Sequence, residues 1–496
     1  MTLAPNHLLR SNGNNLLWLF LLIAILFTSC DAFRKASSTE EPVSRNEKEN
    51  EKEELDEIQS NRRYNPKTGK YEYVKELNSE LDTVRWTEVP AADNPPITSE
   101  GVDFNPGDGT VVDGTPGTAP GGQKLDVYNV AVLLPFLTNR FNSLDGKIND
   151  KSELALQFYS GAKIAMDELS QQGIQLKLDV VDTKASEDEI RRLIDGSALS
   201  DAHMIVGPVR SSNLKLVGEY ARSNFKPLVS PISPSMSAAS NNPYYIQVSP
   251  SLRAHCDAIT RHAKERYRSD QIVLVCRNKK AEINRLRYFQ QTNYMIEGST
   301  LADRLTEFIV TDLSADFNEM DVAPYIKEGD TTVFVIPSWS NESFVYSFLR
   351  KVNLAKGNNQ VVIYGMPQWM RFERISYDYF EQLNVHVSSA NYVDQESPGI
   401  QRFRRSFFER YHMLPTENAY KGYDVMKFFG QMIHRYGTRF QDVIDQQTFT
   451  GANFQYKFER IPESDATPES GANIDHIENT SVDILKFEDY YFQPAY

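Results

Sequence analysis

The chain has 496 residues, of which 40% are hydrophobic and 11% aromatic, and its formal net charge is −14. This length is too great for one hydrophobic core and predicts two or three folded units. The acidic balance, without a strong basic block, argues against non-specific binding to nucleic acid or to an anionic membrane surface.

The first 30 residues have the features of an export signal. Arg10 is followed by an apolar run from Leu16 to Phe27, which is short for a membrane span, and small residues then precede Cys30. This pattern resembles a bacterial lipoprotein signal, which implies that Cys30 is lipidated. The alternative is an uncleaved membrane anchor with an incidental cysteine. Either way, we expect the folded part to lie outside the cytoplasm. With Cys30 lipidated, it would lie in the cell envelope, lipid-anchored to a bacterial membrane, in the periplasm or at the cell surface.

Residues 30–126 have the composition of a flexible tether. The stretch 40–59 is dominated by Glu, Lys and Asn, and 94–122 is rich in Gly, Pro, Thr and Asp, so neither can bury enough apolar surface to offset its chain entropy. Between them, the aromatic residues of 64–74 flank Asn-Pro and Thr-Gly turn signals. This part is either a weakly structured linker or a small hairpin that docks on another surface.

Ordered structure is expected from Tyr128 onward. A first series alternates strands with helices, and Ser186 with Glu189 has the pattern of a capping box at the start of one helix. The expected strands are 128–134, 176–181, 204–206, 227–229 and 245–248. The expected helices are 154–169, one beginning at Ser186, and one around 214–221.

The same alternation then repeats. Strands are expected at 271–276, 307–311, 331–336, 361–364 and 385–388, and helices at 252–267, 342–352, 399–412 and 417–436. The segments 451–458 and 482–487 have the pattern of antiparallel strands. Two successive βαβ series with crossovers near 249–251 and 390–394 predict an α/β protein of two doubly wound lobes, each with a parallel sheet.

Five short segments, in order, resemble the type I periplasmic-binding fold, the family of branched-chain amino-acid-binding proteins. They are Val130 to Pro135, Phe158 to Leu169, Ile205 to Ser212, Pro227 to Ser233, and Ala419 to Val425. Together with Phe449-Thr450-Gly451 and the closing strands, the resemblance covers residues 128–490. It implies a first lobe of 127–249 with 391–437 and a second lobe of 250–390 with 438–496. The lipoprotein-signal pattern separately predicts a signal peptide at 1–29.

The resemblance also implies a ligand site between the lobes. Loop hydroxyl and N–H groups of that family hold a carboxylate, and groups of the second lobe hold an ammonium. By position, the first lobe would contribute Phe136, Ser211, Ser212 and Ser233, and the second Ser338, Trp339, Gln368 and Trp369. Two departures make a free amino acid an unsafe ligand: the second loop has Ile232-Ser233, and 366–368 has no carboxylate to pair with an ammonium.

The serines and tryptophans also have purely structural interpretations. Ser211 and Ser212 could cap their helix, and Trp339 and Trp369 could pack on the lobe surface. Tyr423-Asp424 is expected to serve core and hinge contacts.

Cysteine usage leaves one question open. With Cys30 lipidated, Cys256 and Cys276 remain, at helix and strand positions that share one sheet edge. They predict either a disulfide or two buried free thiols.

No motif predicts catalysis, a metal or a cofactor. Two Ser-x-x-Lys patterns and one Lys-Thr-Gly occur, but in the wrong order for a penicillin-recognising enzyme and without Ser-Asp-Asn. His255 and His262 are two helical turns apart, too far for one metal without a third ligand. We therefore expect a protein that is not an enzyme.

Two functions remain open. The first is a lipid-anchored binding protein that closes two lobes on an amino acid, a peptide or a cell-wall fragment, with a permease as partner. The second is a regulator or scaffold that resembles penicillin-binding-protein activators, with a cell-wall synthase as partner. A tether of roughly 95 residues spans about 50–60 Å, which suits the second function, because a protein beside its permease needs no such reach.

Overall fold

The computed structural model describes residues 122–141, 148–234, 241–298, 304–312, 314, 317–462 and 474–495, and the backbone of three short strands at 62–65, 70–73 and 111–112. The chain divides into two units, Met1–Asp82 and Thr83–Tyr496. The expected signal peptide, Cys30 and most of the expected tether lie outside the described residues.

Two parts of the expected tether are nevertheless described as strands. In the first unit, β1 (Arg62–Asn65) and β2 (Lys70–Tyr73) form an antiparallel hairpin, which confirms the hairpin interpretation of the aromatic stretch. In the second unit, β3 (Val111–Val112) pairs antiparallel with β14 (Thr448–Thr450), so residues 111–112 form an edge strand of a sheet.

The first lobe is built on a nine-stranded sheet. Its order is β3-β14-β15-β16-β8-β7-β6-β4-β5, and the strands from β8 to β5 are parallel. The bounds of its strands not yet given are β4 (Tyr128–Leu134), β5 (Leu176–Asp182), β6 (Met204–Val206), β7 (Leu228–Ser230), β8 (Tyr245–Gln247), β15 (Gln455–Pro462) and β16 (Ile474–Asn479).

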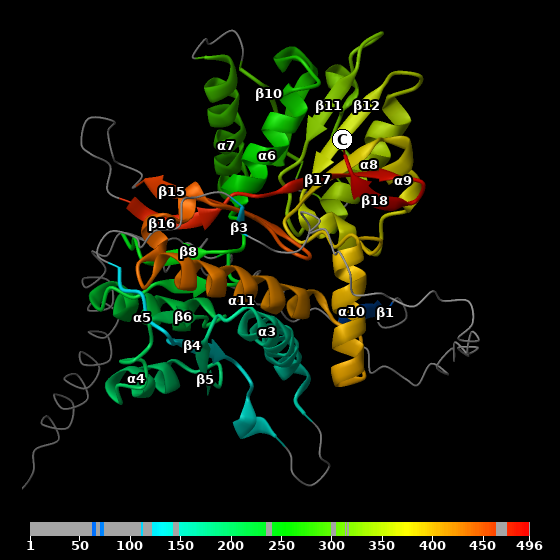
Figure 1. The fold of residues 1–496 in the computed structure, drawn as a ribbon. Coiled ribbons are helices and arrows are strands. Elements are labelled where there is room, and N and C mark those ends of the chain that lie inside the picture. Colours follow the sequence, from blue (N-terminus) through cyan, green and yellow to red (C-terminus); the bar gives the residue numbers. More distant parts are fainter. Residues whose placement is uncertain are drawn as a thin grey trace, which may run out of the picture. The chain divides into compact units, whose positions relative to one another are not determined.

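Helices cover both faces of this sheet (Figure 1). Because successive side chains of a strand point to opposite faces, Val130 and Val132 of β4 pack with α3, α10 and α11, whereas Ala131 and Leu133 pack with α4 and α5. The helices are α3 (Glu153–Gln171), α4 (Glu187–Asp195), α5 (Ser211–Ser223), α10 (Pro398–Tyr411) and α11 (Glu417–Tyr436).

The second lobe repeats this plan with a seven-stranded sheet of order β10-β9-β11-β12-β13-β17-β18. The first five strands are parallel, and β17 and β18 are antiparallel additions. The strands are β9 (Ile272–Arg277), β10 (Thr306–Val310), β11 (Thr332–Val335), β12 (Val361–Gly365), β13 (Val385–Ser389), β17 (Asp483–Glu488) and β18 (Tyr491–Pro494).

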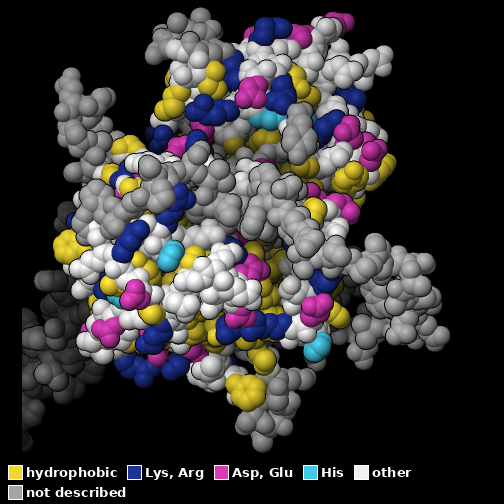
Figure 2. Space-filling view, viewed as in Figure 1, with side chains coloured by type: hydrophobic (Ala, Val, Ile, Leu, Met, Phe, Trp, Pro, Cys, Tyr) yellow, Lys and Arg dark blue, Asp and Glu magenta, His cyan; other side chains and the backbone are white. Residues whose placement is uncertain are grey.

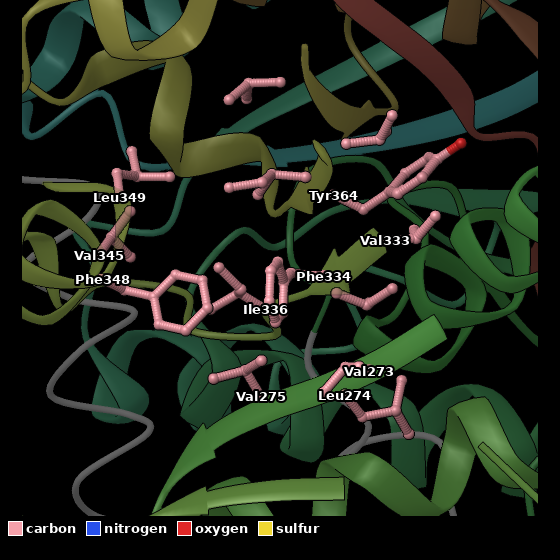
Figure 3. Packing of buried hydrophobic residues seen from close by; sticks show 14 of the residues in the cluster. Val273, Leu274, Val275, Val333, Phe334, Ile336, Val345, Phe348, Leu349 and Tyr364 are labelled. Carbon is pink, nitrogen blue, oxygen red and sulfur yellow. The ribbon is translucent and has the colours of Figure 1, made fainter. Parts of the chain in front are cut away.

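The second lobe also has helices on both faces of its sheet (Figure 1). These are α6 (Leu252–Lys264), α7 (Lys280–Glu297), α8 (Glu342–Ala355) and α9 (Tyr377–Gln382). Branched side chains of β9 and β11 meet those of α8 in the core, where the rings of Phe334 and Phe348 pack edge to face at 5.2 Å (Figure 3).

Three segments cross between the lobes: 248–251 from β8 to α6, 390–397 from β13 to α10, and 480–482 from β16 to β17. The structure therefore confirms the predicted class, an α/β protein with two doubly wound lobes joined by crossovers, which is the type I periplasmic-binding fold.

Two details of the prediction are wrong. Strands β14 to β16 belong to the first sheet, although we expected all of 438–496 in the second lobe, because β16 extends the open edge at β8 and carries β15 and β14 with it. The capping box at Ser186 does not form, since Glu189 pairs instead with Lys184 and Arg192.

Candidate functional site

The strand order positions the candidate site. When the five parallel strands of each lobe are numbered in chain order, they lie side by side in the order 2-1-3-4-5. The connections that follow the first and the third strand therefore run in opposite directions across the sheet. A crevice forms outside the carboxyl ends of the strands at such a reversal, and ligands of open α/β sheets bind there. The reversal lies between β4 and β6 in the first lobe and between β9 and β11 in the second.

At the first reversal, Gly207 leads the chain from β6 to α5. Its φ is +85°, a conformation that favours glycine, and a Cβ built on it would lie 3.2 Å from the carbonyl carbon of Leu133. The N-cap position of α5 is Arg210, so neither Ser211 nor Ser212 caps the helix. The Oγ atom of Ser212 is buried and has no hydrogen-bond partner in the structure.

Phe136 follows β4 and Ser233 follows β7, two strand ends of the same edge that are separated by β6. The half-buried ring of Phe136 packs edge to face on Tyr159 at 5.9 Å, and its carbonyl accepts a hydrogen bond from Ser152 Oγ at 2.7 Å. Ser233 is buried, and its carbonyl accepts a hydrogen bond from Ser230 Oγ at 3.4 Å. Both residues therefore have structural contacts at the positions where we expected ligand contacts.

The end of β5 contributes a carboxylate that sequence analysis missed. Asp182 accepts hydrogen bonds from the backbone N–H groups of Leu137 (3.1 Å), Thr138 (2.8 Å) and Lys184 (2.8 Å). Burial alone would raise the pKa of Asp182, but the hydrogen bonds from Thr138, Lys184 and Leu137 outweigh it and hold the pKa below its ordinary value. The carboxylate of Asp182 thus occupies N–H groups at this edge of the sheet that a ligand anion would otherwise use.

At the second reversal, Ser338 and Trp339 follow β11. Ser338 is 2% exposed, and its Oγ atom has no hydrogen-bond partner, whereas its carbonyl accepts a bond from Trp369 Nε1 at 3.0 Å. The half-buried ring of Trp339 packs edge to face on His255, 5.7 Å away. Of the two tryptophans, Trp339 is therefore the one that retains exposed ring surface.

His255, in the first turn of α6, was not predicted as a site residue. It is 4% exposed, its Nδ1 atom has no partner, and burial lowers its pKa to about 4, so the ring is neutral at physiological pH. Its contact with Trp339 joins α6 to the loop after β11. In the sequence, His255 could have been chosen as a site residue because it lies just after the crossover at 249–251.

The loop after β12 corrects one predicted site residue. Trp369 is fully buried in the core of the second lobe, so it is not available to a ligand. Gly365 permits this, because a Cβ there would overlap the ring of Trp369. Gln368 is only half-buried, and its Oε1 atom has no hydrogen-bond partner.

Two arginines complete the second edge. Arg277, at the end of β9, forms an ion pair with Glu282, which also accepts a hydrogen bond from the backbone N–H of Arg277 at 3.0 Å. Arg285 of α7 donates to the carbonyl of Pro337 at 3.3 Å and thus fastens the loop that carries Ser338. These groups were not predicted, because nothing in the sequence distinguishes them from surface arginines.

Both remaining cysteines are buried free thiols, so the disulfide alternative is wrong for this structure. Burial raises the pKa of Cys276 to about 12 and that of Cys256 further. Asp424 of α11 is buried and accepts backbone hydrogen bonds from residues 452–454, which confirms its predicted core contacts.

Among the described residues, no group of three or more His, Cys, Asp or Glu side chains could hold a metal ion. Within the same part of the chain, no helix is long and apolar enough to cross a bilayer. On the face drawn in Figure 2, Lys and Arg side chains lie among Asp and Glu.

Comparison with known proteins agrees with this geometry. The model of the family described as "Receptor family ligand binding region" matches residues 159–483. No curated protein matches. The structure is similar to a putative branched-chain amino acid ABC transporter from Rhodospirillum rubrum, with a TM-score of 0.54 and 12% identity over 74% of this chain and 100% of that chain.

Two further structures are similar. One is a branched-chain amino acid ABC transporter periplasmic ligand-binding protein from Burkholderia xenovorans, with a TM-score of 0.50 and 11% identity over 74% of this chain and 94% of that one. The other is LpoA from Haemophilus influenzae, with a TM-score of 0.49 and 14% identity over 75% of this chain and 60% of LpoA.

The fold and the paired strand-end loops define a two-lobed protein of the periplasmic-binding type. The family match covers more than half of the sequence, and the chain belongs to the receptor family ligand-binding region.

Proposed function

We propose that the chain is an extracytoplasmic, lipid-anchored binding protein that closes its two lobes on a small ligand. The ligand classes that we consider are amino acids, peptides and cell-wall fragments. In this proposal Cys30 carries the lipid, and the chain has no catalytic role.

The observation that carries the proposal is a set of buried polar atoms without partners at both reversals. Ser212 Oγ lies at the first reversal, and Ser338 Oγ and His255 Nδ1 lie at the second, with Gln368 Oε1 at the next strand end. Leaving a buried polar atom without a partner costs about 1–3 kcal/mol, so most such atoms are hydrogen-bonded. A ligand could supply these bonds once the surrounding loops open, because the protein covers all four atoms in this structure.

The chemistry of these groups favours a ligand with hydroxyl or amide groups. Neutral His255, two serine hydroxyls and an amide provide donors and acceptors without net charge, and Trp339 adds exposed ring surface. Residues 366–368 contain no carboxylate to pair with an ammonium. A sugar-containing or peptide fragment therefore fits this set better than a free amino acid.

Calorimetry on the whole chain in mild detergent, with amino acids, dipeptides and amino-sugar fragments as ligands, tests the proposal. We expect a hit whose affinity falls about tenfold in Ser212→Ala and in Ser338→Ala, because each removes a buried hydrogen bond. The exposed Ser406→Ala is the matched control. Binding of none of these ligands would contradict the proposal, and unchanged binding in both buried variants would contradict the site.

The regulatory alternative is supported by the burial of Met366 and Trp369, which removes two side chains of the loop after β12 from ligand contacts. Cross-linking in envelope extracts separates the two functions. Recovery of a permease supports the binding protein, and recovery of a cell-wall synthase supports the regulator.

The anchor has its own test. Cys30→Ser should abolish incorporation of labelled fatty acid and move the chain from the membrane fraction to the soluble fraction, whereas Cys276→Ser should do neither. Labelling that persists in Cys30→Ser would contradict lipidation at this cysteine.

A further inference from the structure

The described residues contain a cavity of about 310 Å³ that none of the predicted site residues lines. Its walls come from one continuous segment, 391–420, which includes the second crossover, α10 and the start of α11. The polar lining includes Asn391, Gln395, Arg404, Glu417 and Tyr420, and Leu414, which is 61% exposed, lies at its rim. The volume is at the lower end of the range for small-molecule sites.

The negative charge of this cavity is already neutralised. Glu417 forms ion pairs with Lys421 at 2.9 Å and with Arg371 at 3.1 Å. Burial alone would raise the pKa of Glu417, but the charges of Lys421 and Arg371 outweigh it and hold the pKa below its ordinary value. Glu417 is therefore ionised and has two cationic partners at physiological pH.

The positive charge of Arg404 is not neutralised in this way. Its guanidinium donates one hydrogen bond, to Gln395 Oε1 at 2.9 Å, and no carboxylate among the described residues forms an ion pair with it. Tyr420 beside it is 4% exposed, and burial raises its pKa, so its phenol stays protonated and can donate. The cavity thus combines a free cation, a neutral donor and two amide side chains.

We propose that this cavity binds a small organic anion, with its carboxylate or phosphate on Arg404 and its apolar part against Val393 and Leu414. Arginine presents a planar fork of donors that matches both kinds of anion, and partial enclosure strengthens the attraction relative to bulk water. None of the residues proposed to hold a ligand at the strand ends lines this cavity, so the proposal goes beyond the proposed function, although Glu417 pairs with Arg371 of the loop that carries Gln368.

Matched probes can test the charge that the cavity selects. Calorimetry on the whole chain in mild detergent would compare hexanoate, inorganic phosphate and hexylammonium, which has the tail of hexanoate with the opposite charge. We expect at least one of the two anions to bind and hexylammonium not to bind. Binding of neither anion, or equal binding of hexylammonium, would overturn the proposal.

Two variants and one control locate the site. Arg404→Gln should weaken anion binding at least about tenfold, whereas Arg405→Gln, at an exposed neighbour on the same helix, should leave it within about twofold. Leu414→Trp places a larger side chain at an exposed rim position and should also reduce binding, even if Arg404→Gln fails to fold. Unchanged binding in Leu414→Trp or in folded Arg404→Gln, or an equal loss in Arg405→Gln, would refute the site.

Discussion

Close backbone packing between α3 and α11 holds the first lobe together, and one substitution tests it. A Cβ built on Gly422 of α11 would overlap the carbonyl group of Phe158 of α3, 2.7 Å from its carbonyl carbon and 2.9 Å from its Cα. Gly161 of α3 meets Ala419 of α11 in the same way, with a Cβ 2.8 Å from the carbonyl carbon. Because backbone atoms form both obstacles, the helices must separate to accept a methyl group.

The expected cost follows from two opposing terms. Overpacking costs about 1–3 kcal/mol and more where the neighbour cannot move, whereas alanine gains about 1 kcal/mol over glycine inside a helix. Because both obstacles are backbone atoms, we take the upper overpacking cost of about 3 kcal/mol. Less the gain of about 1 kcal/mol, Gly422→Ala should lose about 2 kcal/mol net, which corresponds to a fall of roughly 4–8 °C in the melting temperature of the lobe.

Gly430 of the same helix is the matched control. A Cβ there meets the side-chain methyl groups of Leu169 (2.6 Å) and Leu176 (2.9 Å), which can rotate away. Gly430→Ala should therefore change stability by less than about 1 kcal/mol. Thermal unfolding of the whole chain, followed by circular dichroism, compares the two. Equal melting temperatures for the two variants would refute the reasoning.

Three further predictions use the same assay or simple titrations. Burial alone would lower the pKa of His476, but the carboxylates of Glu478 and Asp475 outweigh burial and raise the pKa. Protonated His476 therefore stabilises the fold at low pH, and this stabilisation is lost as the pH rises through the folded-state pKa. His476→Gln should thus destabilise more at about pH 5 than at about pH 9, and an equal loss at both would contradict this. Cys256 and Cys276 should react with a thiol reagent only after unfolding, without a reductant; a need for reductant would indicate a disulfide. Trp369→Phe should cost about 1–3 kcal/mol while Trp339→Phe costs less than about 1 kcal/mol, and the reverse order would contradict the burial of Trp369.

The sequence predicted most of the parallel framework, because buried strands with flanking helical periodicity are strong local signals. The run Met204-Ile205-Val206 and helix 417–436 were predicted with the bounds that the structure shows. Strand β16 was missed because its sequence, Ile474–Asn479, contains Asp, His and Glu but few apolar residues. Its pairing with β8 is a long-range contact that no local pattern encodes.

The candidate site was predicted in part for the same reason. Ser212, Ser338 and Gln368 were taken by position from the family resemblance, which relies on strand ends that are visible in the sequence. The structure leaves a polar atom of each without a partner, and their ligand contacts stay a prediction. Trp369 also follows a strand, but Gly365 lets its ring fold back into the core, which depends on packing. Arg404 carries no such signal, because its lack of an anionic partner is a property of the folded surroundings and not of the residues beside it in the chain.

The distribution of charge bears on the ligand. At the first reversal, N–H groups of residues 137, 138 and 184 donate to Asp182, and these hydrogen bonds hold its pKa below the ordinary value although burial alone would raise it, so the carboxylate is ionised at neutral pH. A ligand carboxylate placed there would meet a like charge and find these donors in use. The second reversal combines the neutral Ser338 and His255 with the arginines at 277 and 285, and Arg404 donates to Gln395 beside the crossover. In our two proposals, uncharged polar groups are recognised at the strand ends and anions at Arg404. Under these proposals, a single amino acid with both charges would suit neither place.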